Sequence, residues 1–157
     1  MNKRIPLVTC LCVVFVFAVA PVAIPDASAQ RGAPATPACG PNLPAEIGNV
    51  APDSRCFELR TYTVNDDSSI DLLHRRFRER TNPLFEKHGM TIVGFWQRVS
   101  EPNTLTYMLS YPDGAARDAM WAAFGSDPEW IETRNEMQVG LQVESVFMSA
   151  TDYSPIK

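Results

Sequence analysis

Residues 56–64, CFELRTYTV, alternate between two sets of side chains. One set holds Phe57, Leu59 and Thr61, and the other holds Glu58, Arg60 and Tyr62. A period of two residues predicts a β-strand whose faces meet different surroundings. Three later segments also have the composition of strands: 91–100, 104–111 and 141–150.

Between the first two strands the apolar period changes to that of a helix. One narrow stripe, at 100° per residue, holds Ile70, Leu73, Phe77, Thr81 and Leu84. Ser68 with Asp71 fits a capping box at the start. Gly89 fits a left-handed cap at the end. Pro83 projects away from the stripe, so we expect a kink there rather than the end of the helix.

The remaining elements complete a recognisable order. Asp113 is placed to cap a helix that runs through Phe124, and Asp127-Pro128 to begin another short helix. The order is β-α-β-β-α-β with an extra helical segment before the last strand. This predicts an α+β, ferredoxin-like fold, with a four-stranded antiparallel sheet and helices on one face.

Helices on one face leave the other face of the sheet without cover. We expect that face to carry Glu58, Arg60 and Tyr62 from the first strand. From the second strand it carries either Phe95 or Trp96. A face that mixes aromatic and charged groups favours pairing with another subunit. The pattern therefore predicts a homodimer whose two sheets close on each other.

Residues 1–29 have the order of a secretory signal peptide. Lys3 and Arg4 precede a mostly apolar run to Ile24, and Ala27-Ser28-Ala29 offers a cleavage site. Cleavage predicts a periplasmic or secreted protein of 128 of the 157 residues. The alternative is an uncleaved membrane anchor, since about 20 apolar residues can span a bilayer.

Residues 30–54 are proline-rich and lack periodicity, which is typical of a flexible linker before a single domain at 55–157. Of the four cysteines, Cys39 and Cys56 follow the signal segment. Neither belongs to a CxxC pattern or has a histidine near it in sequence, so we predict no metal site. A disulfide is the role that an exported chain favours for this pair, and it would tie the linker to the first strand.

The charge balance argues against a nucleic-acid partner. Removal of the signal segment changes the formal net charge from −4 to −5. The one basic cluster is Arg75, Arg76, Arg78 and Arg80. Asp71 and Glu79 alternate with it at helical spacing, which indicates a solvated helix face. An anionic membrane is disfavoured for the same reason, so membrane contact is expected only through an uncleaved signal segment.

Six segments together resemble the NIPSNAP family: FELRTYTV, PLFEKHGM, VGFWQ, TYMLSY, AMWAAFGSDPEW and MSATDYSP. The resemblance covers about 56–157 and implies a dimeric α/β barrel, which agrees with the element order. The activity of the family is poorly defined. Its wider superfamily includes cofactor-independent monooxygenases, haem-handling enzymes and ligand binders without catalytic activity, so the fold does not choose a function.

No strong catalytic motif is present. His74 falls on the shoulder of the apolar stripe with Arg78 one turn further on, which suits either a general base or a boundary histidine bonded to the backbone. His88 continues the stripe directly before Gly89 and is explained by the helix end.

Trp96, Tyr107 and Trp121 either line an apolar ligand pocket or only fill the core. Arg78 is a further candidate for the wall of such a pocket. Two hypotheses follow. One is an exported dimer that binds a small apolar or aromatic molecule, with cofactor-independent oxidative chemistry assisted by His74. The other is a non-catalytic dimerisation module. Whether the protein is an enzyme is left open, and no cofactor is predicted.

Overall fold

The computed structural model describes residues 36–41 and 43–157. The predicted signal peptide at 1–29 and residues 30–35 of the predicted linker lie outside this range. The elements are β1 (Cys56–Val64), α1 (Ile70–Arg76), a π-helical turn (Phe77–Thr81), α2 (Asn82–Lys87), β2 (Thr91–Gln97), β3 (Thr104–Tyr111), α3 (Gly114–Ser126), α4 (Pro128–Glu136) and β4 (Leu141–Ser149). This sequence of elements confirms the predicted α+β order.

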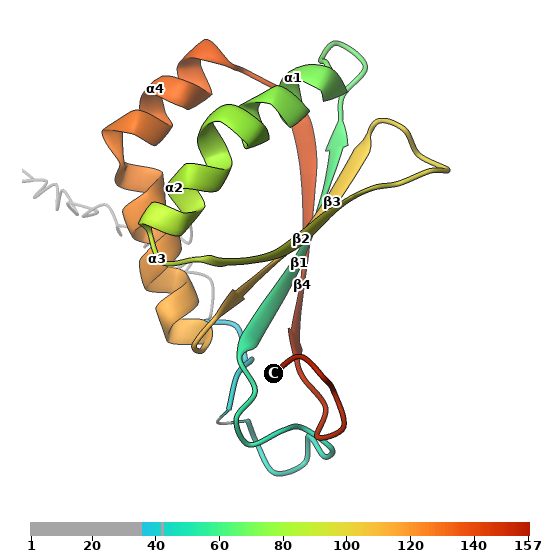
Figure 1. The fold of residues 1–157 in the computed structure, drawn as a ribbon, viewed down its shortest axis with the longest axis vertical. Coiled ribbons are helices and arrows are strands. Elements are labelled where there is room, and N and C mark those ends of the chain that lie inside the picture. Colours follow the sequence, from blue (N-terminus) through green and yellow to red (C-terminus); the bar gives the residue numbers. More distant parts are fainter. Residues whose placement is uncertain (1–35, 42) are drawn as a thin grey trace, which may run out of the picture. The chain divides into compact units, whose positions relative to one another are not determined.

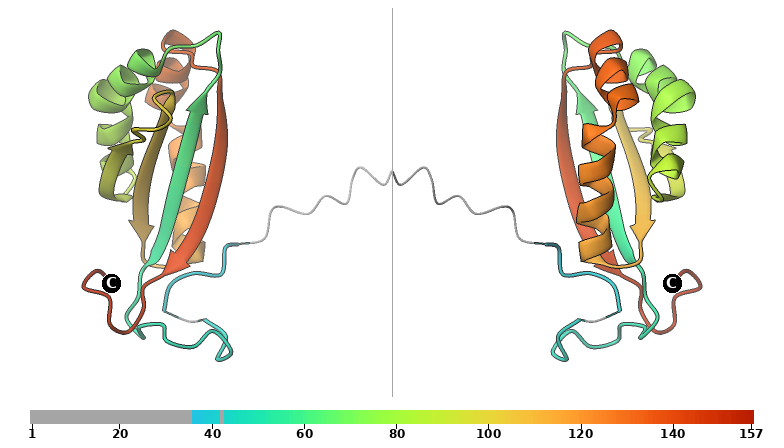
Figure 2. Two further views of the ribbon diagram at one scale, coloured as in Figure 1. Left: turned by 90° about the vertical axis from the view of Figure 1, so that its right-hand side faces the viewer. Right: turned by 90° about the vertical axis from the view of Figure 1, so that its left-hand side faces the viewer.

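The four strands form one antiparallel sheet in the order β2-β3-β1-β4. Within the described residues, all helices lie against one face of this sheet, and no helix covers the other face (Figures 1 and 2). The two largest fully buried side chains, Tyr107 and Tyr111, belong to the central strand β3, and Phe85 and Leu73 from the helices are buried as well. The core therefore lies between the sheet and the helices, as the ferredoxin-like prediction requires.

The first helical region comprises α1, the π-helical turn and α2, and it follows the predicted apolar stripe. Leu73, Phe77, Thr81 and Leu84 are all buried. Ser69, rather than the predicted Ser68, caps the helix by accepting a hydrogen bond from the Leu72 amide at 3.3 Å. Gly89 has a φ of 78°, the left-handed conformation expected for it.

The irregularity expected near Pro83 takes the form of the π-helical turn that precedes it. There the amide of Asn82 donates to the carbonyl of Phe77, five residues earlier. Pro83 has no amide hydrogen and its ring crowds the preceding turn, so a regular helix is costly at this point. The wider turn accommodates the proline and lets the chain continue into α2.

The prediction for the two faces of β1 is wrong. Glu58, Arg60 and Tyr62 point toward the helices: Arg117 of α3 donates to Glu58, and the ring of Tyr62 lies 6.1 Å from that of Phe77. Burial of a lone charge is costly. Here the charges are paired with one another, so burial is tolerated.

The bare face instead carries the alternate residues of β1, including Leu59. Trp96 belongs to this face, because it pairs with Thr106 and its ring lies over Gly94, whereas Phe95 points to the helices and contacts Phe77. Val146 of β4 is opposite Leu59 and is 54% exposed. The face is thus more apolar than the sequence pattern indicated.

The segment that precedes β1 is held at the lower end of the sheet, beside the C-terminal segment (Figures 1 and 2). A disulfide joins Cys39 to Cys56, the pairing that the sequence favoured. Ala51 is fully buried and its amide donates to Ala150 at 2.9 Å, and Val50 forms a bridge with Thr151. Residues 43–54 are therefore anchored, although the composition is that of a flexible linker. Within the described residues, no helix has the length and apolarity needed to cross a membrane.

Candidate functional site

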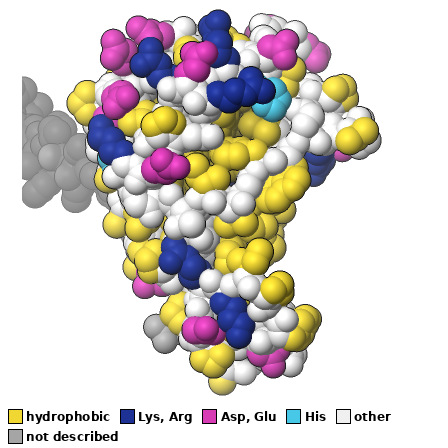
Figure 3. Space-filling view, in the orientation of Figure 1, with side chains coloured by type: hydrophobic (Ala, Val, Ile, Leu, Met, Phe, Trp, Pro, Cys, Tyr) yellow, Lys and Arg dark blue, Asp and Glu magenta, His cyan; other side chains and the backbone are white. Residues whose placement is uncertain are grey.

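A cleft of about 250 Å³ opens between the first helical region and the edge of the sheet. Its lining residues are His74, Phe77, Arg78, Asn82, Phe95, Trp96, Gln97 and Leu105. Figure 3 shows hydrophobic side chains in the hollowed middle of this face of the molecule, with cationic groups at its upper edge. The cleft combines an aromatic wall with a few polar groups, which is typical of small-molecule sites.

The tautomer of His74 follows from its neighbours. His74 Nε2 lies 2.8 Å from Gln97 Oε1. The amide nitrogen of Gln97 donates to the carbonyls of Pro102 and Thr104 at 3.0 and 3.1 Å. The oxygen of that amide must therefore face the imidazole, so His74 Nε2 carries the hydrogen. In the neutral ring, Nδ1 is left as the nitrogen that can accept a proton.

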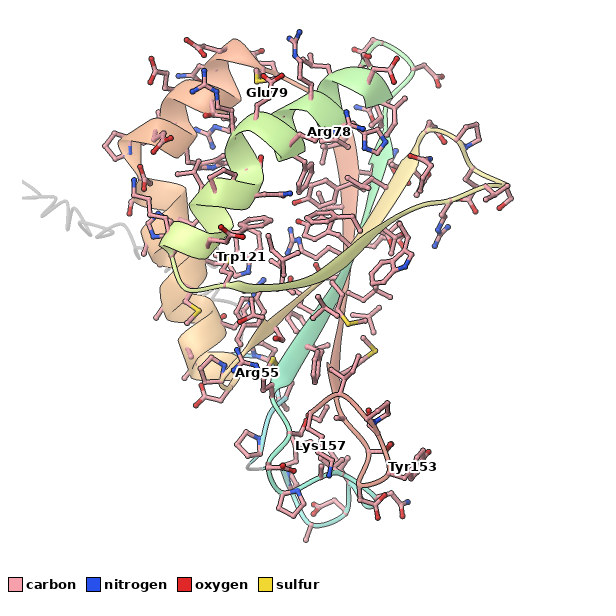
Figure 4. All side chains as sticks on the ribbon, in the orientation of Figure 1. Arg55, Arg78, Glu79, Trp121, Tyr153 and Lys157 are labelled. Atoms are coloured by element: carbon pink, nitrogen blue, oxygen red, sulfur yellow. A yellow bond between two sulfur atoms is a disulfide. The ribbon has the colours of Figure 1, made fainter. Side chains whose placement is uncertain are left out.

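Two other polar side chains line the cleft. Arg78 is exposed (Figure 4) and forms no ion pair within the part of the chain that the structure describes. Asn82 Oδ1 is buried and has no hydrogen-bond partner in the described part of the chain. Together with His74 they offer a cation, an acceptor and a proton acceptor along one wall. His74 and Arg78, the polar candidates from the sequence, thus lie in the same cleft.

The three aromatic candidates do not form one pocket. Tyr107 is fully buried, and its hydroxyl donates to that of Tyr62 at 2.9 Å. Trp121 lies between α3 and the sheet (Figure 4) and donates to Tyr111 at 2.8 Å. Trp96 is half exposed and lies over Gly94, so it lines only the edge of the cleft. Phe77, Phe95 and Leu105 supply the apolar wall, a role that the sequence pattern did not indicate for them.

A buried polar cluster around Glu58 was not apparent from the sequence. Its carboxylate is fully buried and accepts hydrogen bonds from Arg60, Arg117, Tyr111 and Trp121. Burial by itself would raise the pKa of Glu58. The hydrogen bond from Arg117 and the charges of Arg60 and Arg117 outweigh burial and lower that pKa to about 2. The carboxylate is therefore ionised and is held in place by hydrogen bonds from four side chains, which suits a structural role rather than proton transfer.

The comparisons with known proteins identify the family of this chain. The NIPSNAP family model matches residues 57–155. The chain belongs to the NIPSNAP family. No functionally curated protein matches the sequence.

Solved NIPSNAP structures share the fold of this chain at low sequence identity. A NIPSNAP family protein of unknown function from Agrobacterium tumefaciens str. C58 is 17% identical, with a TM-score of 0.59. The alignment covers 66% of this chain and 94% of that one. A second protein from the same bacterium is 16% identical, with a TM-score of 0.60 and coverage of 66% and 99%. An uncharacterised NIPSNAP domain protein from Burkholderia xenovorans is 20% identical, with a TM-score of 0.57 and coverage of 64% and 98%.

His88 of this NIPSNAP protein has a partner that the sequence did not reveal. His88 Nε2 lies 2.7 Å from Asp127 Oδ2, and Asp127 also caps α4 by accepting from the Glu129 amide at 2.9 Å. Lys87 pairs with the same carboxylate at 2.8 Å. These contacts join the end of α2 to the start of α4, so His88 is structural. Among the described residues, no group of histidine, cysteine and acidic side chains is arranged to hold a metal ion.

Proposed function

We propose that this NIPSNAP protein binds a small aromatic or apolar molecule with one acidic group in the cleft beside α1. The observation that carries the proposal is that one cleft combines an apolar wall with a histidine and with an arginine that is unpaired within the described residues. Phe77, Phe95 and Leu105 form the wall, and His74 and Arg78 lie beside it. Its volume of about 250 Å³ suits a ligand of one or two rings.

Each polar side chain of the cleft has its own role in this proposal. His74 Nδ1 accepts the proton of an enol or phenol group of the ligand, and Arg78 pairs with the oxyanion that this transfer forms. The Gln97 amide holds the imidazole in the tautomer that this transfer needs. An enolate or phenolate formed in this way is electron-rich enough to react with dioxygen directly. Cofactor-independent oxidation is therefore the reaction class that we propose, with binding, orientation and proton transfer supplied by the protein.

The test is a binding titration with 1-naphthoic acid and 2-naphthol, followed by protein NMR. Binding in the cleft gives saturable shifts at Phe77 and Phe95. His74→Gln and Arg78→Gln weaken this binding. Arg75→Gln is the matched control, because Arg75 is an exposed arginine of the same helix outside the cleft. Saturable binding elsewhere, or the same affinity in all three variants, would contradict the proposal.

A second function is favoured by the bare sheet face. We propose that it forms a homodimer, because Val146 is 54% and Trp96 50% exposed there, next to Leu59 and Met108. Val146→Asp then produces monomers in analytical ultracentrifugation. Val143→Asp is the control, since Val143 lies on the same strand, is 45% exposed and faces the opposite side. A monomeric wild-type protein, or equal effects of the two variants, would exclude dimerisation through this face.

We also propose export with cleavage after Ala29. The order of basic, apolar and small residues in the sequence supports it. The Cys39–Cys56 disulfide is consistent with an oxidising compartment. Mass spectrometry of the protein from its native host should find a mature chain that begins at Gln30. An intact N-terminus in the membrane fraction would favour the anchor instead.

A further inference from the structure

A second cavity lies where the C-terminal end of α4 meets α1, and two of its lining residues are arginines. The cavity has a volume of about 400 Å³ and is lined by Arg76, Arg134, Asn135, Gln138, Val139 and Gly140. The residues that line the His74 cleft do not contribute to it. It is therefore a separate feature that the proposed function does not use.

Arg76 is the unusual member of this cavity. It is only 6% exposed, yet no carboxylate within residues 36–41 and 43–157 forms an ion pair with it. Arg60 and Arg117, by contrast, both pair with Glu58. A buried guanidinium without a countercharge is destabilising, so it calls for an explanation.

The described residues supply only some of the hydrogen bonds that the Arg76 guanidinium can donate. Its Nη1 donates to the Met137 carbonyl at 3.2 Å, and its guanidinium lies 5.6 Å from the Trp130 ring. Its Nε is buried and has no hydrogen-bond partner among the described residues. The carbonyl end of α4 supplies a partial negative charge, which is less than a full counterion. Burial lowers the pKa of Arg76, in keeping with this incomplete compensation.

We propose that this cavity is a binding site for a small oxyanion, a carboxylate or phosphate group, with Arg76 as the central residue and Arg134 as the second cation. The Nε–Nη2 edge of a guanidinium matches two oxygens of such a group. In the part of the chain that the structure describes, no group accepts a hydrogen bond from Arg76 Nε, and the guanidinium's hydrogen bond to Met137 comes from Nη1. Arg134 and Gln138 line the same cavity and are exposed, so an anion can approach Arg76 from their side.

The residues around the cavity limit the size of the ligand and the position of its charged group. The cavity is larger than a single phosphate group requires, which leaves room for a small organic body on the same molecule. Asn135 and Gln138 add amide groups beside the arginines. Asp67 lies close to the Gly140 end and repels an anion, so the charged group belongs at the Arg76 end.

The experiment compares the thermal unfolding of the purified full chain in inorganic phosphate, succinate and chloride at equal ionic strength. We expect a saturable rise in Tm with phosphate or succinate, about 4 °C at roughly ten times the Kd, and no such rise with chloride. Arg76→Met should abolish the rise and should itself be at least as stable as the wild type in chloride. Arg134→Gln should weaken the binding several-fold. Arg75→Met, the exposed neighbour, should leave it unchanged.

A second measurement does not depend on whether Arg76→Met folds: the NMR signal of the Arg76 Nε–H group in the wild-type protein. This signal should shift in proportion to the anion that is bound, whether or not Arg76→Met folds. A response to phosphate alone assigns a phosphorylated ligand, and a response to succinate alone assigns a carboxylate. A rise in Tm that is equal in chloride, or that persists in Arg76→Met, overturns the proposal. A wild-type Nε–H signal that does not respond to either anion also overturns it.

Discussion

Replacing Glu58 by glutamine tests whether charge pairing holds the sheet against α3. Glu58 is fully buried, and its carboxylate accepts hydrogen bonds from two arginines, a tyrosine and a tryptophan. Glutamine keeps the size of the side chain but removes the charge. It also places an NH₂ group opposite donors that need an acceptor. Arg60 and Arg117 are then left near each other without their counterion.

The expected loss at pH 7 is about 3–5 kcal/mol, the usual cost of removing one partner from a buried ion pair. The pKa of Glu58 gives an independent figure. Its decrease from 4.5 to about 2 corresponds to about 3 kcal/mol, at roughly 1.4 kcal/mol for each tenfold change in proton affinity. Because the folded-state pKa is the lower one, this stability is present above pH 4.5 and is lost as the pH falls toward 2.

The assay is urea unfolding of the wild type and Glu58→Gln at several pH values between 7 and 2.5. Other acidic groups titrate in both proteins, so their contributions cancel in the difference between the two free energies of unfolding. That difference should be largest at neutral pH and should shrink toward zero near pH 2, where Glu58 is protonated and resembles glutamine. A difference that stays constant with pH would show that packing, and not charge, accounts for the loss.

Three further predictions concern the ends of the elements. Serine at both Cys39 and Cys56 should cost about 2–4 kcal/mol in urea unfolding, and dithiothreitol should destabilise only the wild type. Gly89→Ala should cost about 1 kcal/mol because of the positive φ there. Gly125→Ala, a helical site with open space around it, should be neutral or stabilising under the same conditions. Asp127→Ala should lower Tm at pH 7, and the effect should fade toward pH 2. The hydrogen bonds from Lys87 and His88 lower the pKa of Asp127 from 3.8 to about 2. The stability that the ionised carboxylate contributes is therefore present above pH 3.8 and is lost as the pH falls toward 2.

The order of elements was predictable because it depends on local signals. The period of β1, the apolar stripe of the first helical region and the caps at Asp113 and Asp127 all act within a few residues. Each of these appears in the structure. The capping serine was displaced by one residue, since Ser68 and Ser69 are chemically equivalent and Ser68 bonds to Gly140 instead.

The orientation of β1 was not predictable in the same way. An alternation identifies two faces, but the choice of the buried face depends on partners far along the chain. Arg117 and Trp121 lie about sixty residues after Glu58, and they convert a costly burial into a satisfied one. The apolar wall of the cleft was missed for a related reason, because Phe77 and Phe95 meet only when β2 lies beside the first helical region.

The four arginines of the first helical region show where the same reasoning succeeds and where it fails. Arg75, Arg78 and Arg80 are exposed, as expected of a solvated face. Arg76 lies three residues after the buried Leu73 and therefore at the border of the apolar stripe. A border position is covered or left open according to what packs over it, and here Trp130 and Met137 from the α4 region cover it. Helical periodicity identifies Arg76 as a border residue, but only the tertiary contact makes it a buried charge in need of an anion.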